Sequence, residues 1–128
     1  PDGRDPEVID YTDQAGMHKA LQKVLHRLVN EENIKPDDII VLTPKGQNRS
    51  EVNAGLRLGN FQLVDRPTSR PNEIMVTTIQ KFKGLEQKVV IITELDSSVH
   101  FDFEKIMYIG CSRARTHLVL IHHVDQTI

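Results

Sequence analysis

The sequence lacks the cysteines of a disulfide framework and the long hydrophobic runs of a membrane span. It contains one cysteine in 128 residues, so an internal disulfide is excluded and a reducing compartment is favoured. We therefore expect a cytoplasmic location, or a nuclear one in a eukaryote. The longest hydrophobic runs are far shorter than the roughly 20 residues that cross a bilayer, so no membrane is expected among the partners. His122 and His123 are adjacent and would point to opposite faces of a strand, and no metal site is expected.

Size and composition fit a single folded domain over residues 1–128. Hydrophobic residues make up 38% of the chain and charged residues 27%, which is the balance of a globular domain with its own core. The formal charge of −2 neither requires nor excludes a nucleic-acid partner, because a small basic cleft does not show in that sum. The chain begins with proline rather than methionine, so we expect a fragment of a larger protein, with residues 1–6 disordered.

Hydrophobic periodicity predicts strands that alternate with helices. Apolar residues at helical spacing predict an amphipathic helix over 13–30, with Thr12 or Asp13 as its N-cap, and further helices over 50–58 and 103–113. Apolar runs predict strands over 7–11, 39–42, 61–64, 74–79, 89–92 and 116–122. This alternation is typical of a doubly wound α/β fold, in which helices flank a mostly parallel sheet.

Three polar clusters interrupt this pattern at predicted strand ends. They occupy residues 43–49 (TPKGQNR), 78–86 (TIQKFKGLE) and 108–115 (YIGCSRAR). Ligands of open α/β sheets bind beyond the carboxyl ends of the strands, where such loops emerge. We therefore expect the three clusters to gather on one rim of the sheet.

Two of these clusters carry motifs of a known family. The segments TTIQKFKGLE (77–86) and YIGCSRARTHLVL (108–120) resemble motifs V and VI of UvrD/Rep-type superfamily 1 helicases, and QNR (47–49) is similar to motif IV. The resemblance implies the second, C-terminal member of a pair of RecA-like (P-loop NTPase-type) domains that close around ATP. The sequence contains no GxxxxGK(S/T) motif. The Walker A half and the Mg²⁺ ligands are therefore expected on an N-terminal RecA-like domain of the same protein.

The resemblance also implies roles for residues near the nucleotide. Arg113 in motif VI would act as an arginine finger on the γ-phosphate, and Arg49 in motif IV is a second catalytic candidate. Glu86 would accept a hydrogen bond from the ribose, Gly84 would allow a backbone conformation or a close approach that a side chain blocks, and Lys83 would also lie at the nucleotide. Simpler alternatives stay open. Arg113 would then only complement a helix dipole, and the other charged residues would be solvated loop side chains.

Thr78 and Gln80 are the residues expected to contact a nucleic-acid strand. Threonine hydroxyls hold phosphates without reading base sequence. Gln80 stands where the family commonly has histidine, and glutamine can hydrogen-bond but cannot become cationic. Phe82, Tyr108 and Cys111 are expected to pack in the core.

Together these features predict the second motor domain of an ATP-dependent helicase or translocase that moves on single-stranded DNA or RNA. Without its own Walker A motif, the isolated chain is expected to hydrolyse no ATP. Only 28 residues, 50–77, separate the motif IV segment from Thr78, too few for an inserted helical subdomain, so a compact motor is expected. Two alternatives stay open: a non-catalytic RecA-like module that binds nucleic acid or a protein partner, and a small α/β enzyme acting on another phosphorylated ligand.

Overall fold

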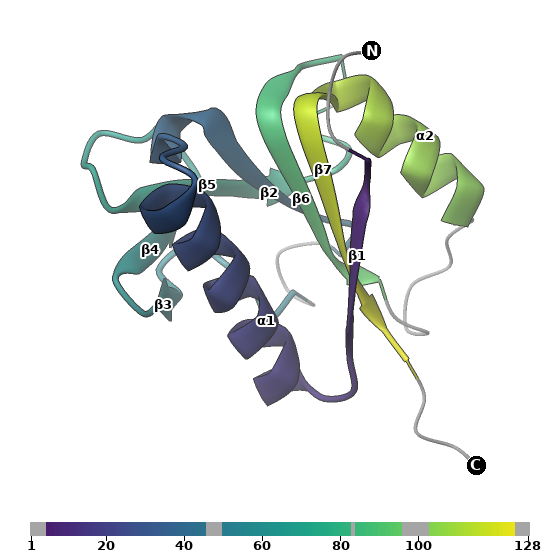
Figure 1. The fold of residues 1–128 in the computed structure, drawn as a ribbon, viewed down its shortest axis with the longest axis horizontal. Helices are drawn as coiled ribbons and strands as arrows, with labels where there is room; N and C mark the ends of the chain where they lie inside the picture. Colours follow the sequence, from purple (N-terminus) through teal and green to yellow (C-terminus); the bar gives the residue numbers. More distant parts are fainter. Residues whose placement is uncertain (1–4, 46–49, 83, 96–102, 125–128) are drawn as a thin grey trace.

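The computed structural model describes residues 5–45, 50–82, 84–95 and 103–124, which form a seven-stranded sheet with helices packed against it (Figure 1). In spatial order the strands of these ranges are β1-β7-β6-β2-β5-β4-β3, and neighbours are parallel except for β3 and β4. Their bounds are Glu7–Tyr11 (β1), Ile39–Thr43 (β2), Arg57–Leu58 (β3), Phe61–Val64 (β4), Glu73–Thr78 (β5), Gln87–Leu95 (β6) and Ala114–His123 (β7). The predicted α/β class and mostly parallel sheet are confirmed.

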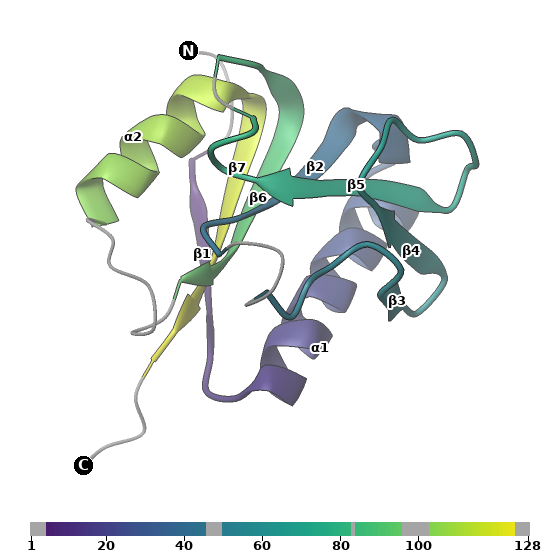
Figure 2. The ribbon, with the colours of Figure 1, turned by 180° about the vertical axis from the view of Figure 1, so that it is seen from behind.

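The helices α1 (Gln14–His26) and α2 (Phe103–Arg113) lie on opposite faces of the sheet (Figures 1 and 2). Alternate residues of the central strands pack into two hydrophobic cores, one on each face. The core beneath α1 takes Ile39, Val41, Val89 and Ile91, and the core beneath α2 takes the intervening Ile40, Leu42, Val90 and Ile92. Both faces are covered, which is why these strands read as continuous apolar runs in the sequence. In the described part of the chain, no helix combines the length and apolar character needed to span a bilayer.

The first helix begins where the sequence predicted. Asp13 is its N-cap, and its Oδ1 accepts a hydrogen bond from the Gly16 N–H at 2.7 Å. The helix continues as a π-helical turn, Arg27–Glu31, so the helical segment ends one residue past the predicted limit. A short 3₁₀ helix, Pro36–Asp38, then leads into β2. Residues 1–4 of the segment expected to be disordered lie outside the described ranges.

The prediction of a helix over residues 50–58 is wrong. The end of this segment is β3, which forms an antiparallel hairpin with β4. Gly55 adopts a φ of 94°, and its N–H donates to the Leu63 carbonyl at 2.8 Å. A left-handed residue and a bond to a distant strand are both incompatible with a helix here. Gly59 lies in the hairpin turn with a φ of 63°.

The second helix has the predicted bounds, but two of its side chains do not pack in the core as expected. Tyr108 is 76% exposed, and Cys111 is also exposed. Ile106 and Gly110, one turn apart, face the sheet instead, and a Cβ on Gly110 would meet both Leu118 methyl carbons at 2.7 Å. Gly110 therefore lets α2 approach the sheet closely, and the helical period turns Tyr108 and Cys111 towards solvent.

Candidate functional site

The polar clusters expected on one rim are divided between two opposite edges of the sheet. At the carboxyl edge, Thr43 ends β2 beside Thr78, the last residue of β5. At the amino edge, Gln87 begins β6 beside Ala114, the first residue of β7. Because β5 and β6 are both parallel to β2, the chain between them, residues 79–86, must cross from one edge to the other. The expectation of a single rim was wrong for this reason.

Glu86 and Arg113 are neighbours at the amino edge. Each directly precedes one of the two residues, Gln87 and Ala114, that are partners in the β6–β7 ladder. Glu86 is exposed and Arg113 is half-buried. Neither side chain makes a hydrogen bond or ion pair within the ranges that the structure describes. A carboxylate acceptor and a guanidinium donor are therefore available to a ligand at the same edge.

Backbone hydrogen bonds and a buried aromatic ring fix the first part, residues 79–82, of the crossing segment 79–86. The Ile79 N–H donates to the Thr43 carbonyl at 3.0 Å, and the Phe82 N–H donates to the Thr78 carbonyl at 3.2 Å. Phe82 is 6% exposed and packs in the core beneath α2, as the sequence predicted. Beyond it, Gly84 adopts a φ of 83°, and no atom lies within 4 Å of the place that a Cβ would take. The backbone conformation, rather than crowding, thus favours glycine at this position.

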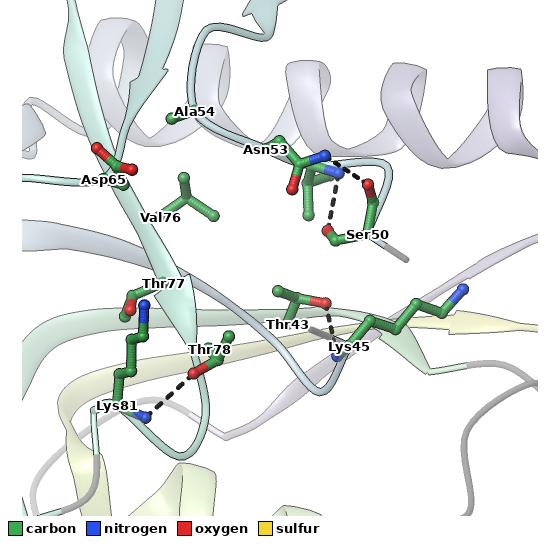
Figure 3. A pocket seen from close by; sticks show the side chains of 11 residues that line it. Thr43, Lys45, Ser50, Asn53, Ala54, Asp65, Val76, Thr77, Thr78 and Lys81 are labelled. Atoms are coloured by element: carbon green, nitrogen blue, oxygen red, sulfur yellow. Dashed lines mark hydrogen bonds between the residues drawn. The ribbon is translucent and has the colours of Figure 1, made fainter. Parts of the chain in front are cut away.

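A cavity of about 300 Å³ lies at the carboxyl edge, beside the ends of β2, β4 and β5 (Figure 3). Its lining is mostly polar and consists of Thr43, Lys45, Ser50, Asn53, Asp65, Thr77, Thr78 and Lys81, with Val52, Ala54 and Val76 as the apolar part. The volume is at the lower end of the range for ligand pockets, about 300–1,000 Å³. The cavity therefore suits one small polar group rather than a large cofactor.

The two threonines at this edge differ in what their hydroxyl groups can still bind. Thr43 Oγ1 donates to Glu94 Oε1 at 2.8 Å and accepts from the Lys45 N–H at 3.1 Å, so its proton is already committed. Thr78 Oγ1 accepts from the Lys81 N–H at 3.1 Å, and its own proton has no acceptor among the described residues. Thr78 can therefore donate to a ligand oxygen without losing an existing bond, and Thr43 cannot.

Gln80 and Lys81 extend the polar surface next to Thr78. Gln80 is exposed in the turn after β5, and its side chain makes no hydrogen bond to any part of the chain that the structure describes. Lys81 is also exposed and lines the cavity, and Figure 3 shows its side chain rising towards Thr77. Sequence reasoning selected Gln80 but gave Lys81 no role, although a cation three residues beyond a strand end was a usable signal.

A buried carboxylate that sequence reasoning missed lies at the same edge. Glu94, near the end of β6, is 1% exposed and has a φ of 60°. Its carboxylate accepts hydrogen bonds from the hydroxyls of Thr43 and Ser50 and from the Glu51 N–H, and it lies 3.8 Å from the Lys45 ammonium. No motif marks this position, since a glutamate after an apolar run reads as the solvated end of a strand.

Two candidate residues, Arg49 and Lys83, lie outside the described residues, and their roles stay predictions. Lys45 and Ser50, which flank the segment of Arg49, both line the cavity at the carboxyl edge. Across the described ranges, no group of three or more His, Cys, Asp or Glu side chains is placed to hold a metal ion.

Part of the chain matches a known protein family. Residues 73–121 match the family model of the UvrD-like helicase C-terminal domain. The matched span runs from β5 through the crossing segment, β6 and α2 into β7, so it includes both motifs and both edges described above. No match is found among the curated proteins.

A solved structure shares the fold. It is the C-terminal domain of a possible DNA helicase from Lactobacillus plantarum WCFS1, which matches with a TM-score of 0.68 and 19% sequence identity over 96% of this chain and 76% of that chain. At this identity the likeness concerns the fold. The family match confirms the resemblance drawn from the two motifs, and residues 73–121 are similar to a UvrD-like helicase C-terminal domain.

Proposed function

We propose that this chain is the second motor domain of an ATP-dependent superfamily 1 helicase or translocase that acts on single-stranded DNA or RNA. In this proposal residues 1–128 form one domain of a longer protein, and an N-terminal RecA-like domain supplies the Walker A loop and the ligands of Mg²⁺. The observation that carries the proposal is the position of Glu86 and Arg113, neighbours at the amino edge whose side chains bind nothing else in the described part of the chain.

The amino edge would contribute half of an ATP site. The Arg113 guanidinium carries a fixed positive charge and several N–H donors, which suits the γ-phosphate. The Glu86 carboxylate suits the ribose hydroxyls and would repel the phosphates, so the pair distinguishes the two ends of a nucleotide. ATP would supply the phosphoryl group and Mg²⁺ would neutralise part of its charge. The residues of this chain would bind the nucleotide and orient it.

The carboxyl edge would hold the nucleic-acid strand. The Thr78 hydroxyl and the Gln80 amide can donate to phosphate oxygens, and the Lys81 ammonium adds positive charge beside them. Contacts of this kind do not depend on base identity, as movement along any sequence requires. Gln80 cannot add a charge of its own, so the strand contact here would depend more on Lys81.

The crossing segment, residues 79–86, would couple the two edges. It begins beside the strand contact at Thr78 and ends at Glu86, and the buried ring of Phe82 fixes its middle. Closure of the two motor domains around ATP would move the amino edge, and this anchored segment would carry that movement to the strand. The coupling thus runs through a continuous stretch of backbone.

Strand-stimulated ATP hydrolysis by the full-length protein tests the proposal. Mg²⁺-dependent hydrolysis should increase when oligo(dT) or oligo(U) is added, and this chain alone should hydrolyse none. ATPase activity of the 128-residue chain alone would refute the proposed division of labour. A full-length protein that binds nucleic acid without hydrolysing ATP would instead favour the non-catalytic module.

A further inference from the structure

Glu94 is a buried carboxylate to which the proposed motor function assigns no task. Its side chain is 1% exposed and lies near the carboxyl end of β6, where the pairing register with β7 shifts. Burying a carboxylate without partners is strongly unfavourable, so its partners indicate what it stabilises.

Among the described residues, the partners of Glu94 come from the end of β2 and from the chain that follows it. Its oxygens accept from the Thr43 hydroxyl at 2.8 Å, the Ser50 hydroxyl at 2.5 Å and the Glu51 N–H at 2.8 Å, and the Lys45 ammonium lies 3.8 Å away. Every partner is a donor, which matches a carboxylate that only accepts. One side chain thereby holds the chain on both sides of residues 46–49.

The backbone conformation at Glu94 favours glycine, so the glutamate side chain itself must be needed at this position. A φ of 60° lies in the left-handed region that favours glycine, and a glycine would relieve the strain. Strain of this kind persists only where the surrounding contacts over-determine the conformation. The contacts of the carboxylate must therefore outweigh the strain.

Three partners of Glu94, namely Thr43, Lys45 and Ser50, also line the cavity at the carboxyl edge, and we call them the Glu94 wall. Figure 3 shows Thr43 of the Glu94 wall beside Thr78, with Lys45 and Ser50 to the right of this pair and Lys81 to the left. The hydroxyl protons of Thr43 and Ser50 are committed to Glu94, so these residues shape the cavity rather than donate into it.

We propose that Glu94 is a positioning residue for the nucleic-acid strand. It holds the Glu94 wall in place, so that a phosphate entering the cavity meets Thr78 and Lys81 at bonding distance. Glu94 itself touches no ligand. This inference rests on the proposed function, because it takes the cavity to be part of the strand site.

The test compares Glu94→Gln with wild type in the full-length protein. Glutamine keeps the shape of the side chain but turns an N–H group towards groups that are themselves donors. We expect fluorescein-labelled oligo(dT) to bind about tenfold more weakly, and the oligo(dT) concentration for half-maximal ATPase stimulation to rise by the same factor. The ATPase rate at saturating oligo(dT) should stay at the wild-type value, because Glu94 lies at the edge opposite Arg113.

Glu73→Gln is the matched control. Glu73 is 4% exposed and also anchors a loop, accepting from Arg66 at 2.8 Å and from the Ser69 N–H at 2.9 Å. Both variants should unfold at a lower temperature, but only Glu94→Gln should lose affinity for oligo(dT). Should Glu94→Gln not fold, Ser50→Ala removes one donor and should weaken binding in the same direction by a smaller factor.

Two outcomes overturn the inference about Glu94 and leave the proposed function standing. The first is that Glu94→Gln binds oligo(dT) as tightly as wild type does. The second is that Glu94→Gln and Glu73→Gln lose the same affinity for oligo(dT), because both substitutions would then act only through protein stability. A wild-type protein that neither binds oligo(dT) nor is stimulated by it overturns the proposed function, and this inference with it.

Discussion

Replacing Gly110 by alanine tests whether the close approach of α2 to the sheet sets the position of Arg113. A Cβ on Gly110 would stand 2.7 Å from both Leu118 methyl carbons and 3.3 Å from Ile92 Cδ1. Carbon atoms prefer separations of about 3.5–4.0 Å. Leu118 is buried beneath α2 and has little room to withdraw, so we expect the helix to move outwards by about 1 Å.

Two opposing terms set the change in the free energy of unfolding for Gly110→Ala. Overpacking a core costs about 1–3 kcal/mol, and replacing glycine by alanine within a helix gains about 1 kcal/mol. We expect a net loss of about 0–2 kcal/mol, which the fold should tolerate. The effect on turnover should be larger, because Arg113 ends the same helix and a misplacement of about 1 Å can cost about 100-fold in rate.

The assay pairs urea unfolding with oligo(dT)-stimulated ATP hydrolysis by the full-length protein. Cys111→Ala is the matched control, because Cys111 is exposed on the other side of α2 and its replacement improves helix propensity without meeting the sheet. The reasoning would be refuted by a Gly110→Ala protein that is about 1 kcal/mol more stable than wild type and hydrolyses ATP at the wild-type rate.

Two further predictions concern a strand contact and the ion pair between Arg66 and Glu73. Thr78→Val should weaken oligo(dT) binding about two- to tenfold, because it removes one hydrogen bond worth about 0.5–1.5 kcal/mol. The salt dependence of oligo(dT) binding should stay unchanged, because the substitution removes no charge. Thr93→Val, which removes a buried hydroxyl with no partner in the described chain, is the control, and equal affinities of the two variants would contradict the assignment of Thr78. Hydrogen bonds from Arg66, and then from the Ser69 backbone, lower the pKa of Glu73 from 4.5 to about 2. The stability that Glu73 contributes is thus complete above about pH 4.5 and is lost as the pH falls towards 2. The free energy of unfolding, measured with urea, should fall more steeply over this pH interval in wild type than in Glu73→Gln. If it falls equally in both proteins, the ion pair contributes nothing to stability.

Elements with strong local signals were predictable from the sequence. The strand at residues 7–11 and the helix at 103–113 have the predicted bounds, because alternation and helical spacing report burial directly. The helix predicted at 50–58 failed because non-local contacts decide that segment. The Gly55 N–H donates to the Leu63 carbonyl of β4, and apolar spacing over so few residues does not distinguish a helix from a hairpin.

The layout of the candidate site was not predictable from the sequence. The motifs identified Thr78, Glu86 and Arg113, yet the expectation of one rim ignored that a connection between parallel strands must return across the sheet. Glu94 had no signal at all, because its role depends on where the chain after β2 folds back. Such tertiary contacts carry no local pattern.

The central claim is that the amino edge of this domain acts on the γ-phosphate through Arg113. The most direct measurement is oligo(dT)-stimulated ATP hydrolysis by the full-length Arg113→Ala variant, together with the affinity of this variant for a fluorescent ATP analogue. Arg115→Ala is the control, because Arg115 is an exposed arginine only two residues further along the chain. We predict that turnover falls by about 10³–10⁵ in Arg113→Ala while nucleotide binding is retained, and that Arg115→Ala stays close to wild type. Turnover near the wild-type rate in Arg113→Ala would contradict the account.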